Sequence, residues 1–176
     1  MNAEFEQIIS FHGHKCPGLT IGYRMAKAAM NFLSDSRAKD EEIVAIVEND
    51  ACGVDAVQCL TGCTFGKGNF IFKDYGKQVY TFYSRNTGKG VRVVYKGGNI
   101  PKSVQNNRQE IINWLLSADE KDIIDIKDVV IKEPEPARMY PTVKCEFCGE
   151  LVMETRTEQI DGKYACIPCA HRYTLQ

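Results

Sequence analysis

Residues 11–26 read FHGHKCPGLTIGYRMA, and this stretch holds both the start of a long helix and three side chains that can bind a metal. Pro17 suits the first turn of a helix, because the N–H that proline lacks would have no partner there. Apolar residues then recur every three or four positions, which predicts an amphipathic helix over 18–33. One face of this helix carries small residues that would let a second backbone come close: Gly18, Gly22, Ala26 and Ala29.

The residues around this helix alternate between helical and extended patterns. Helices are predicted at 3–10, 53–60 and 103–116, and strands at 42–48, 69–73, 78–84, 91–95 and 125–131. Short turns such as DYG and NTGKG separate successive strands, which favours antiparallel pairing. The sequence therefore predicts an α+β fold with a mixed sheet-and-helix core.

The chain has 176 residues, 44% of them hydrophobic, and a net charge of −1, values that suit one globular core with a small appendage. No apolar run reaches the roughly 20 residues of a spanning helix, so we expect no insertion into a membrane. The first residues lack the basic and apolar segments of a secretory signal, which favours the cytoplasm. In that compartment the eight cysteines are expected to stay reduced rather than form disulfides.

The composition changes after the core. Pro134, Pro136 and Pro141 lie close together, and such clusters form stiff extended linkers. We therefore divide the chain into a core at 1–132, a linker at 133–143 and a finger at 144–176. The finger is too short to bury a hydrophobic core unaided, so it needs a metal or another staple.

Four cysteines in the finger have the spacing of a zinc site. KCEFCGE and YACIPCA each contain a C-x2-C knuckle, and seventeen residues separate the two knuckles. Two such knuckles complete a tetrahedral four-sulfur site, which is closed and therefore structural. The ligands are Cys145, Cys148, Cys166 and Cys169. A DG turn predicts a hairpin that delivers the second knuckle, and a short terminal helix follows, as in treble-clef or zinc-ribbon fingers.

The finger does not have the charge of a nucleic-acid-binding module. Between residues 144 and 176 there are four basic against five acidic side chains. A phosphate-binding face normally needs net positive charge. We therefore expect no nucleic-acid partner.

The core contains a second group of cysteines and histidines. His12, His14 and Cys16 occupy every second position, so an extended segment would place them on one side. Cys16 and Cys52 each precede a predicted helix, whose N-terminus favours a thiolate. These two histidines and the cysteines are candidates for metal binding, and His14 and Cys16 are also candidates for catalysis.

Cys63 follows Gly62, which is expected to end the helix at 53–60. GCTFGKG at 62–68 is one residue short of a nucleotide-binding phosphate loop, so it predicts at most a turn in which Lys67 meets a small anionic ligand. Asp55 and Gln58 lie three residues apart on one helix face, where they would orient a ligand, contact a substrate or face solvent. Asp55 and Lys67 are the weaker catalytic candidates, and Cys59 is left out of the site.

The stretch at 11–26 together with ACGVDAVQCLTGCTFGKGN at 51–69 resembles the signature of the FmdE-like family, which is named after a component of formylmethanofuran dehydrogenase. The resemblance covers the core to about residue 130 and implies an α+β core with an appended zinc finger. It also implies one shared pocket for His14, Cys16, Cys52 and Cys63, with Asp55, Gln58 and Lys67 nearby. The family name implies a relation to one subunit of a molybdenum or tungsten oxidoreductase of methanogenesis.

We accordingly expect a core pocket in which His14, Cys16, Cys52 and Cys63 hold a second transition metal, with His12 supporting a ligand by a hydrogen bond. Zinc suits mixed imidazole and thiolate ligands, and iron and nickel remain open. Two other functions stay open: a non-catalytic zinc-finger adaptor or docking protein, and a cysteine-based thiol or sulfur-transfer protein. The small-residue helix face and the linker suggest a homodimer, and the family name suggests a larger enzyme complex.

Overall fold

The structure, a computed structural model, describes residues 3–174. These residues form two compact units, one up to Ala137 and one from Arg138 onward. The division falls inside the segment 133–143 that the prolines marked as a linker. No helix within residues 3–174 combines the length and the apolar character needed to cross a bilayer.

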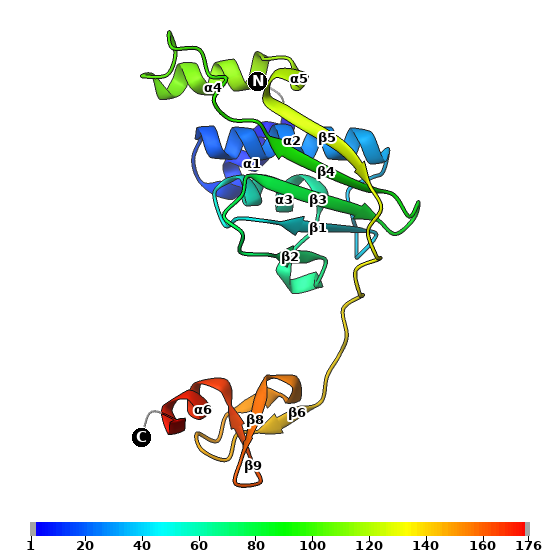
Figure 1. The fold of residues 1–176 in the computed structure, drawn as a ribbon, viewed down its shortest axis with the longest axis vertical. Coiled ribbons are helices and arrows are strands. Elements are labelled where there is room, and N and C mark those ends of the chain that lie inside the picture. Colours follow the sequence, from blue (N-terminus) through cyan, green and yellow to red (C-terminus); the bar gives the residue numbers. More distant parts are fainter. Residues whose placement is uncertain (1–2, 175–176) are drawn as a thin grey trace. The chain divides into compact units, whose positions relative to one another are not determined.

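Within the described residues, the first unit contains five α-helices, one 3-10 helix and five strands. Figure 1 labels the α-helices and the strands. They are α1 (Ala3–His12), α2 (Pro17–Leu33), β1 (Ile43–Val47), α3 (Gly53–Thr61), the 3-10 helix η1 (Phe65–Lys67), β2 (Phe70–Phe72), β3 (Val79–Ser84), β4 (Gly90–Tyr95), α4 (Arg108–Ser117), α5 (Glu120–Ile123) and β5 (Ile124–Val129). This mixture of helices and strands confirms the predicted α+β class.

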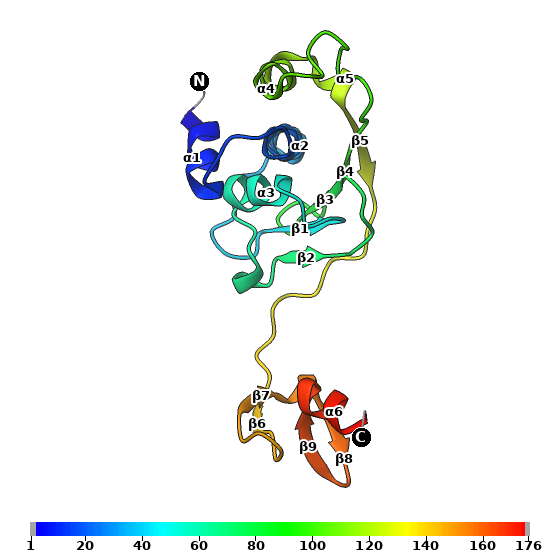
Figure 2. The same cartoon turned by 90° about the vertical axis from the view of Figure 1, so that its left-hand side faces the viewer.

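The five strands form one sheet in the order β2-β1-β3-β4-β5. β1 runs parallel to β2, whereas β3, β4 and β5 continue the sheet by antiparallel pairing. The helices α1, α2 and α3 lie on one face of this sheet (Figure 2). Because side chains alternate across a strand, each strand sends one set toward these helices and the other set to the helix-free face.

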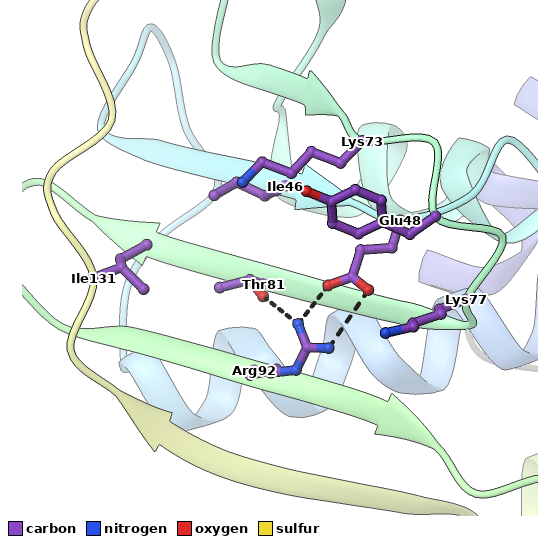
Figure 3. Close-up of a pocket in the computed structure, with 8 residues that line it drawn as sticks. Ile46, Glu48, Lys73, Lys77, Thr81, Arg92 and Ile131 are labelled. Atoms are coloured by element: carbon purple, nitrogen blue, oxygen red, sulfur yellow. Dashed lines mark hydrogen bonds and ion pairs between the residues drawn. The ribbon is translucent and has the colours of Figure 1, made fainter.

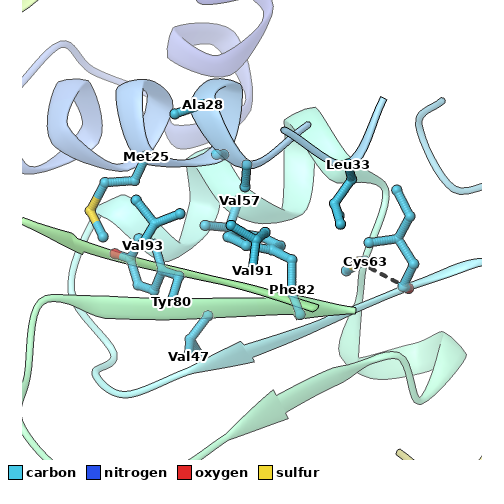
Figure 4. Packing of buried hydrophobic residues seen from close by; sticks show 14 of the residues in the cluster. Met25, Ala28, Leu33, Val47, Val57, Cys63, Tyr80, Phe82, Val91 and Val93 are labelled. Atoms are coloured by element: carbon cyan, nitrogen blue, oxygen red, sulfur yellow. Dashed lines mark hydrogen bonds between the residues drawn. The ribbon is translucent and has the colours of Figure 1, made fainter. Parts of the chain in front are cut away.

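The hydrophobic core fills the space between α2, α3 and the sheet. The side chains that fill it are shown in Figure 4 and include Met25, Leu33, Val57, Tyr80, Phe82, Val91 and Val93. On the opposite face Ile46, Thr81 and Arg92 are register neighbours across β1, β3 and β4. No helix among the described residues of the first unit covers this second set, so polar side chains are tolerated there.

Helices α2 and α3 match their predicted bounds to within one residue, whereas α1 and α4 differ by more. α1 continues to His12 instead of ending at residue 10, and Gly13 then turns the chain with a φ of +91°. α4 begins at Arg108 rather than at 103, because the side chain of Asn107 accepts hydrogen bonds from the N–H groups of Gln109 and Glu110. Such side-chain acceptance at the N-cap defines a helix start.

The second unit is built from β6 (Thr142–Lys144), β7 (Leu151–Met153), the 3-10 helix η2 (Glu154–Arg156), β8 (Thr157–Ile160), β9 (Lys163–Cys166) and α6 (Ile167–Thr174). β8 and β9 form the hairpin that the DG turn predicted, with positive φ at Asp161 and Gly162. The residues 151–153 instead pair with β6, so the first arm of the hairpin is shorter than the sequence suggested.

Candidate metal centres

Four side chains of the first unit converge on one point. The donor atoms of His12, His14, Cys16 and Cys52 all lie within 4.8 Å of one another. Cys16 is buried, His12 and Cys52 are partly buried, and His14 is exposed. The group thus extends from the buried sulfur of Cys16 to the exposed imidazole of His14.

The end of α1 and the start of α2 bring three of these residues together. Because His12 is the last residue of α1 and Gly13 reverses the chain, the segment is a helix end followed by a turn rather than an extended strand. The rings of His12 and His14 lie 4.4 Å apart between centroids. Cys16 is the N-cap of α2, and its sulfur accepts a hydrogen bond from the N–H of Leu19 at 3.3 Å.

His12 is held between a carboxylate and a thiol. Its Nδ1 lies 2.7 Å from Oδ2 of Asp55, and its Nε2 lies 4.0 Å from the sulfur of Cys16. An Nδ1–H that donates to Asp55 leaves the lone pair of Nε2 facing the group. This carboxylate–histidine arrangement is the usual way in which proteins orient a metal-binding imidazole. His12 therefore has the geometry of a ligand, and Asp55 has the supporting role that we had expected of His12.

Cys52 enters the group from the loop before α3. Gly18 lies opposite it, and a Cβ at Gly18 would be 3.4 Å from the Cβ of Cys52. Burial, followed by the neighbouring Cys16 thiol, raises the pKa of Cys52 above its usual value. The N-terminus of α3 was expected to favour a thiolate at Cys52, whereas burial and the neighbouring thiol of Cys16 oppose it.

Two residues expected at this site lie in other surroundings. The thiol of Cys63 is buried in the main hydrophobic core, where it donates to the carbonyl oxygen of Ile43 at 3.2 Å. Burial raises its pKa to about 11. The amine of Lys67 donates to the carbonyl oxygens of Ala38, Lys39 and Asp40, the last at 2.9 Å. Cys63 thus packs as a core residue and Lys67 closes a loop.

The four cysteines of the second unit form the other group. Their sulfur atoms also lie within 4.8 Å of one another: Cys145, Cys148, Cys166 and Cys169. Gly149, with a φ of +79°, donates to the carbonyl oxygen of Cys145 and closes the first knuckle. The N–H of Cys166 donates to the sulfur of Cys145 at 3.3 Å, and this bond is the main cause that lowers the pKa of Cys145 to about 6.

Both groups fit a transition metal by the chemistry of their donors. Four thiolates suit structural zinc, and two imidazoles with two thiolates suit zinc or a neighbouring first-row metal. The sequence did not indicate the contact between His12 and Asp55, because it joins the end of α1 to a residue 43 positions away. The sequence pattern that pointed to Asp55 was its place on the same helix face as Gln58. In the structure, Gln58 donates a hydrogen bond to Asp55 at 3.5 Å.

Two protein-family models match this chain and together cover nearly all of it. Residues 11–137 match the model described as "FmdE, Molybdenum formylmethanofuran dehydrogenase operon". Residues 138–175 match the "Prokaryotic dksA/traR C4-type zinc finger". The second match supports a structural zinc in the finger.

Known proteins resemble the chain over both units. One is a "tungsten formylmethanofuran dehydrogenase subunit e (fmde)-like protein" from Syntrophus aciditrophicus, whose crystal structure matches this chain with a TM-score of 0.67. The two sequences are 30% identical, and the match covers 94% of this chain and 89% of that chain. A "Probable S-adenosyl-L-methionine-binding protein" from Archaeoglobus fulgidus is 33% identical over 93% of this chain. The chain spans about half the length of that curated relative, 51%.

Proposed function

This chain belongs to the FmdE family, as the motifs in its sequence predicted, and we propose that its core binds a transition metal distinct from the finger zinc. The proposed ligands are His12, Cys16 and Cys52, with His14 completing the shell from the exposed side. Zinc is the first candidate, since it accepts imidazole and thiolate together.

The observation that carries this proposal is the support that the protein gives to His12. A carboxylate on Nδ1 fixes the orientation of the ring and leaves Nε2 free to bind, and Asp55 lies 2.7 Å from Nδ1 of His12. The side chain of His12 is 11% exposed and that of Asp55 is 35% exposed, so solvent screens their contact only in part. The result is an imidazole with Nε2 fixed toward two sulfur atoms.

The four donors have unequal roles. Cys16 is anchored by the N–H of Leu19, and Cys52 is held against Gly18, so both sulfur atoms sit on fixed backbone. His14 follows Gly13 and is exposed, so it is the ligand that water or a substrate can replace. A bound metal with one replaceable ligand supplies Lewis acidity to whatever occupies that position.

The test is the metal content of the protein purified without added metal. We expect two ions per chain in the parent and one in a Cys16→Ala, His14→Ala double variant. A Cys59→Ala variant is the matched control, because Cys59 is a partly buried thiol outside the group. Thermal unfolding of both variants shows whether the core is still folded. Equal metal content in the folded double variant and the parent would refute the core site.

A thiol-based function has one specific observation in its favour. The sulfur atoms of Cys16 and Cys52 lie within 4.8 Å, so a modest movement would join them. Under this second proposal Cys16 is the nucleophile and Cys52 the resolving thiol. One ion per chain in the parent, together with rapid alkylation of Cys16, would favour this function over the metal site.

A further inference from the structure

The helix-free face of the core sheet contains a hollow of about 350 Å³. It lies over β1, β3 and β4, and the segment that follows β2 borders it (Figure 3). None of the four side chains of the proposed core metal group lines it. A hollow of this size matches a small organic molecule rather than a segment of protein.

An ion pair between the buried Glu48 and the partly exposed Arg92 forms the floor of the hollow. Glu48 is only 5% exposed, and Arg92 donates to both of its carboxylate oxygens, at 3.5 Å for the second bond. Arg92 also reaches the hydroxyl of Thr81 at 3.5 Å. Thr81 of β3 and Glu48, the residue after β1, thus fix the guanidinium of Arg92 in place, and Glu48 offsets its charge.

The rim of the hollow is a segment whose backbone is tied to β1. The N–H of Lys73 donates to the carbonyl oxygen of Val47 at 2.8 Å, and the N–H of Lys77 donates to that of Glu48 at 3.0 Å. The side chain of Asn49 holds the carbonyl oxygen of Lys77 at 2.6 Å. These hydrogen bonds fix the backbone of residues 73–77, so the side chains of Lys73 and Lys77 are free to contact a ligand.

Those side chains are cationic and aromatic. Lys73, Tyr75 and Lys77 all line the hollow, at every second position of the rim. Neither lysine amine has a hydrogen bond or ion pair to any part of the chain that the structure describes. With Arg92, three cations face one carboxylate here, although the whole chain carries a net charge of −1. The hollow is thus a local excess of positive charge.

The other wall of the hollow is apolar. Ile46 of β1 and Ile131, which follows β5, face it together with the ring of Tyr75. Ile131 is kept near the sheet because Glu133, two residues later, forms an ion pair of 2.6 Å with Arg85. A ligand that fills the hollow must therefore present a flat apolar surface to one wall and an anion to the other.

We propose that this hollow binds an aromatic phosphate ester of the size of a mononucleotide. The phosphate lies between Lys73 and Lys77, and the ring system stacks on Tyr75 above Ile46. Stacking and charge-assisted hydrogen bonds are independent contributions, so a ligand with both binds more tightly than a ligand with one. This site is separate from the proposed metal group and does not rest on it.

Calorimetric titration with adenosine monophosphate, adenosine and inorganic phosphate tests the proposal on the full chain. We expect saturable binding of adenosine monophosphate, and binding weaker by about tenfold or more for adenosine and for phosphate, because each lacks one of the two contacts. Phosphate that binds as tightly as the nucleotide would overturn the proposal, and so would a parent protein that does not bind the nucleotide.

Variants of the rim locate the site. A Lys73→Gln, Lys77→Gln double variant should weaken nucleotide binding by about tenfold or more, and Tyr75→Leu should weaken nucleotide binding without changing phosphate binding. The control is Lys89→Gln, Lys102→Gln, which removes the same charge from exposed positions outside the hollow. These side chains are exposed, so the variants should fold. Equal binding by the rim variant and the control would place the ligand elsewhere and refute the proposal.

Discussion

Gly22 of α2 lies so close to Gly53 of α3 that a Cβ atom on Gly22 would be 2.2 Å from the carbonyl oxygen of Gly53. The small-residue face of α2 is therefore already occupied, because the chain's own α3 packs against it. This face was one reason to predict a homodimer, and it no longer supports one. The homodimer and the larger enzyme complex stay predictions.

The same contact predicts the effect of a single methyl group. Gly22→Ala must separate two backbones, so it should destabilise the core by about 1–3 kcal/mol, the usual cost of overpacking. Denaturant unfolding measures the change. Gly66→Ala is the control, because a Cβ there meets nothing within 4 Å and its φ is not positive. Equal stability of the two variants would contradict the close packing of α2 and α3.

Asp55→Asn should weaken metal binding at the proposed core site. The amide cannot accept from Nδ1 of His12 as strongly as the carboxylate does, so the imidazole loses its fixed orientation. Removal of such a supporting carboxylate typically lowers metal affinity by about 10–100-fold. Competition between the protein and a chelator for cobalt measures this affinity. The finger zinc should be unchanged, and Asp128→Asn, an exposed aspartate on β5, should leave both metals unchanged.

The variant Cys63→Ala tests whether Cys63 is a metal ligand or a residue of the hydrophobic core. Because the thiol of Cys63 is fully buried and donates to Ile43, its loss should lower the free energy of unfolding by about 1–2 kcal/mol. Metal content should stay at the level of the parent. Loss of one metal ion per chain from a folded variant would show instead that Cys63 is a metal ligand.

Cys148→Ser should remove one zinc per chain and make the residues after 138 sensitive to proteases. The finger buries few apolar side chains, so metal binding supplies much of its folding free energy. Limited proteolysis and metal analysis report the two effects. In a Cys59→Ser control, both zinc content and protease resistance should match the parent, whereas unchanged zinc in Cys148→Ser would contradict the finger site.

Asp35 should contribute to stability in mild acid. The buried hydroxyl of Ser84 donates to its carboxylate at 2.6 Å, and this bond lowers the pKa of Asp35 in the folded protein. A carboxyl whose pKa is lower when folded stabilises the fold above its unfolded pKa, about 4, and this stabilisation is lost as the pH falls through the folded pKa. Asp35→Asn should therefore flatten the acid side of the stability profile, which denaturant unfolding at a series of pH values measures.

The helices and turns with strong local signals could be predicted from the sequence. Pro17 begins α2, Gly62 ends α3 with a positive φ, and Asp161–Gly162 form the hairpin turn. The parallel pairing of β1 with β2 could not be predicted, because register between distant strands depends on packing rather than on local pattern.

The candidate metal-binding residues could likewise be predicted where neighbouring residues decide their position, but not where contacts with distant residues do. Cys16 and Cys52 could be named from their places before two helices, and the structure brings their sulfur atoms together. Cys63 lies beside a helix end as well, just after α3, but its side chain points into the hydrophobic core. The spacing of the cysteines does not show whether a side chain points toward the group or into the core. His12 was predicted to support a ligand and is proposed as a ligand itself, because a contact with Asp55, far away in the sequence, decides which nitrogen faces the group.

The two outer strands of the core sheet have a consequence for behaviour at high concentration. β2 is only three residues long, and β5 carries Asp125, Lys127 and Asp128 along an otherwise open border. Short edges and charged edges resist the addition of a strand from another molecule. The edge strands β2 and β5 thus resist pairing with strands of other molecules. Crowding or overexpression should therefore not produce fibrils through these edges.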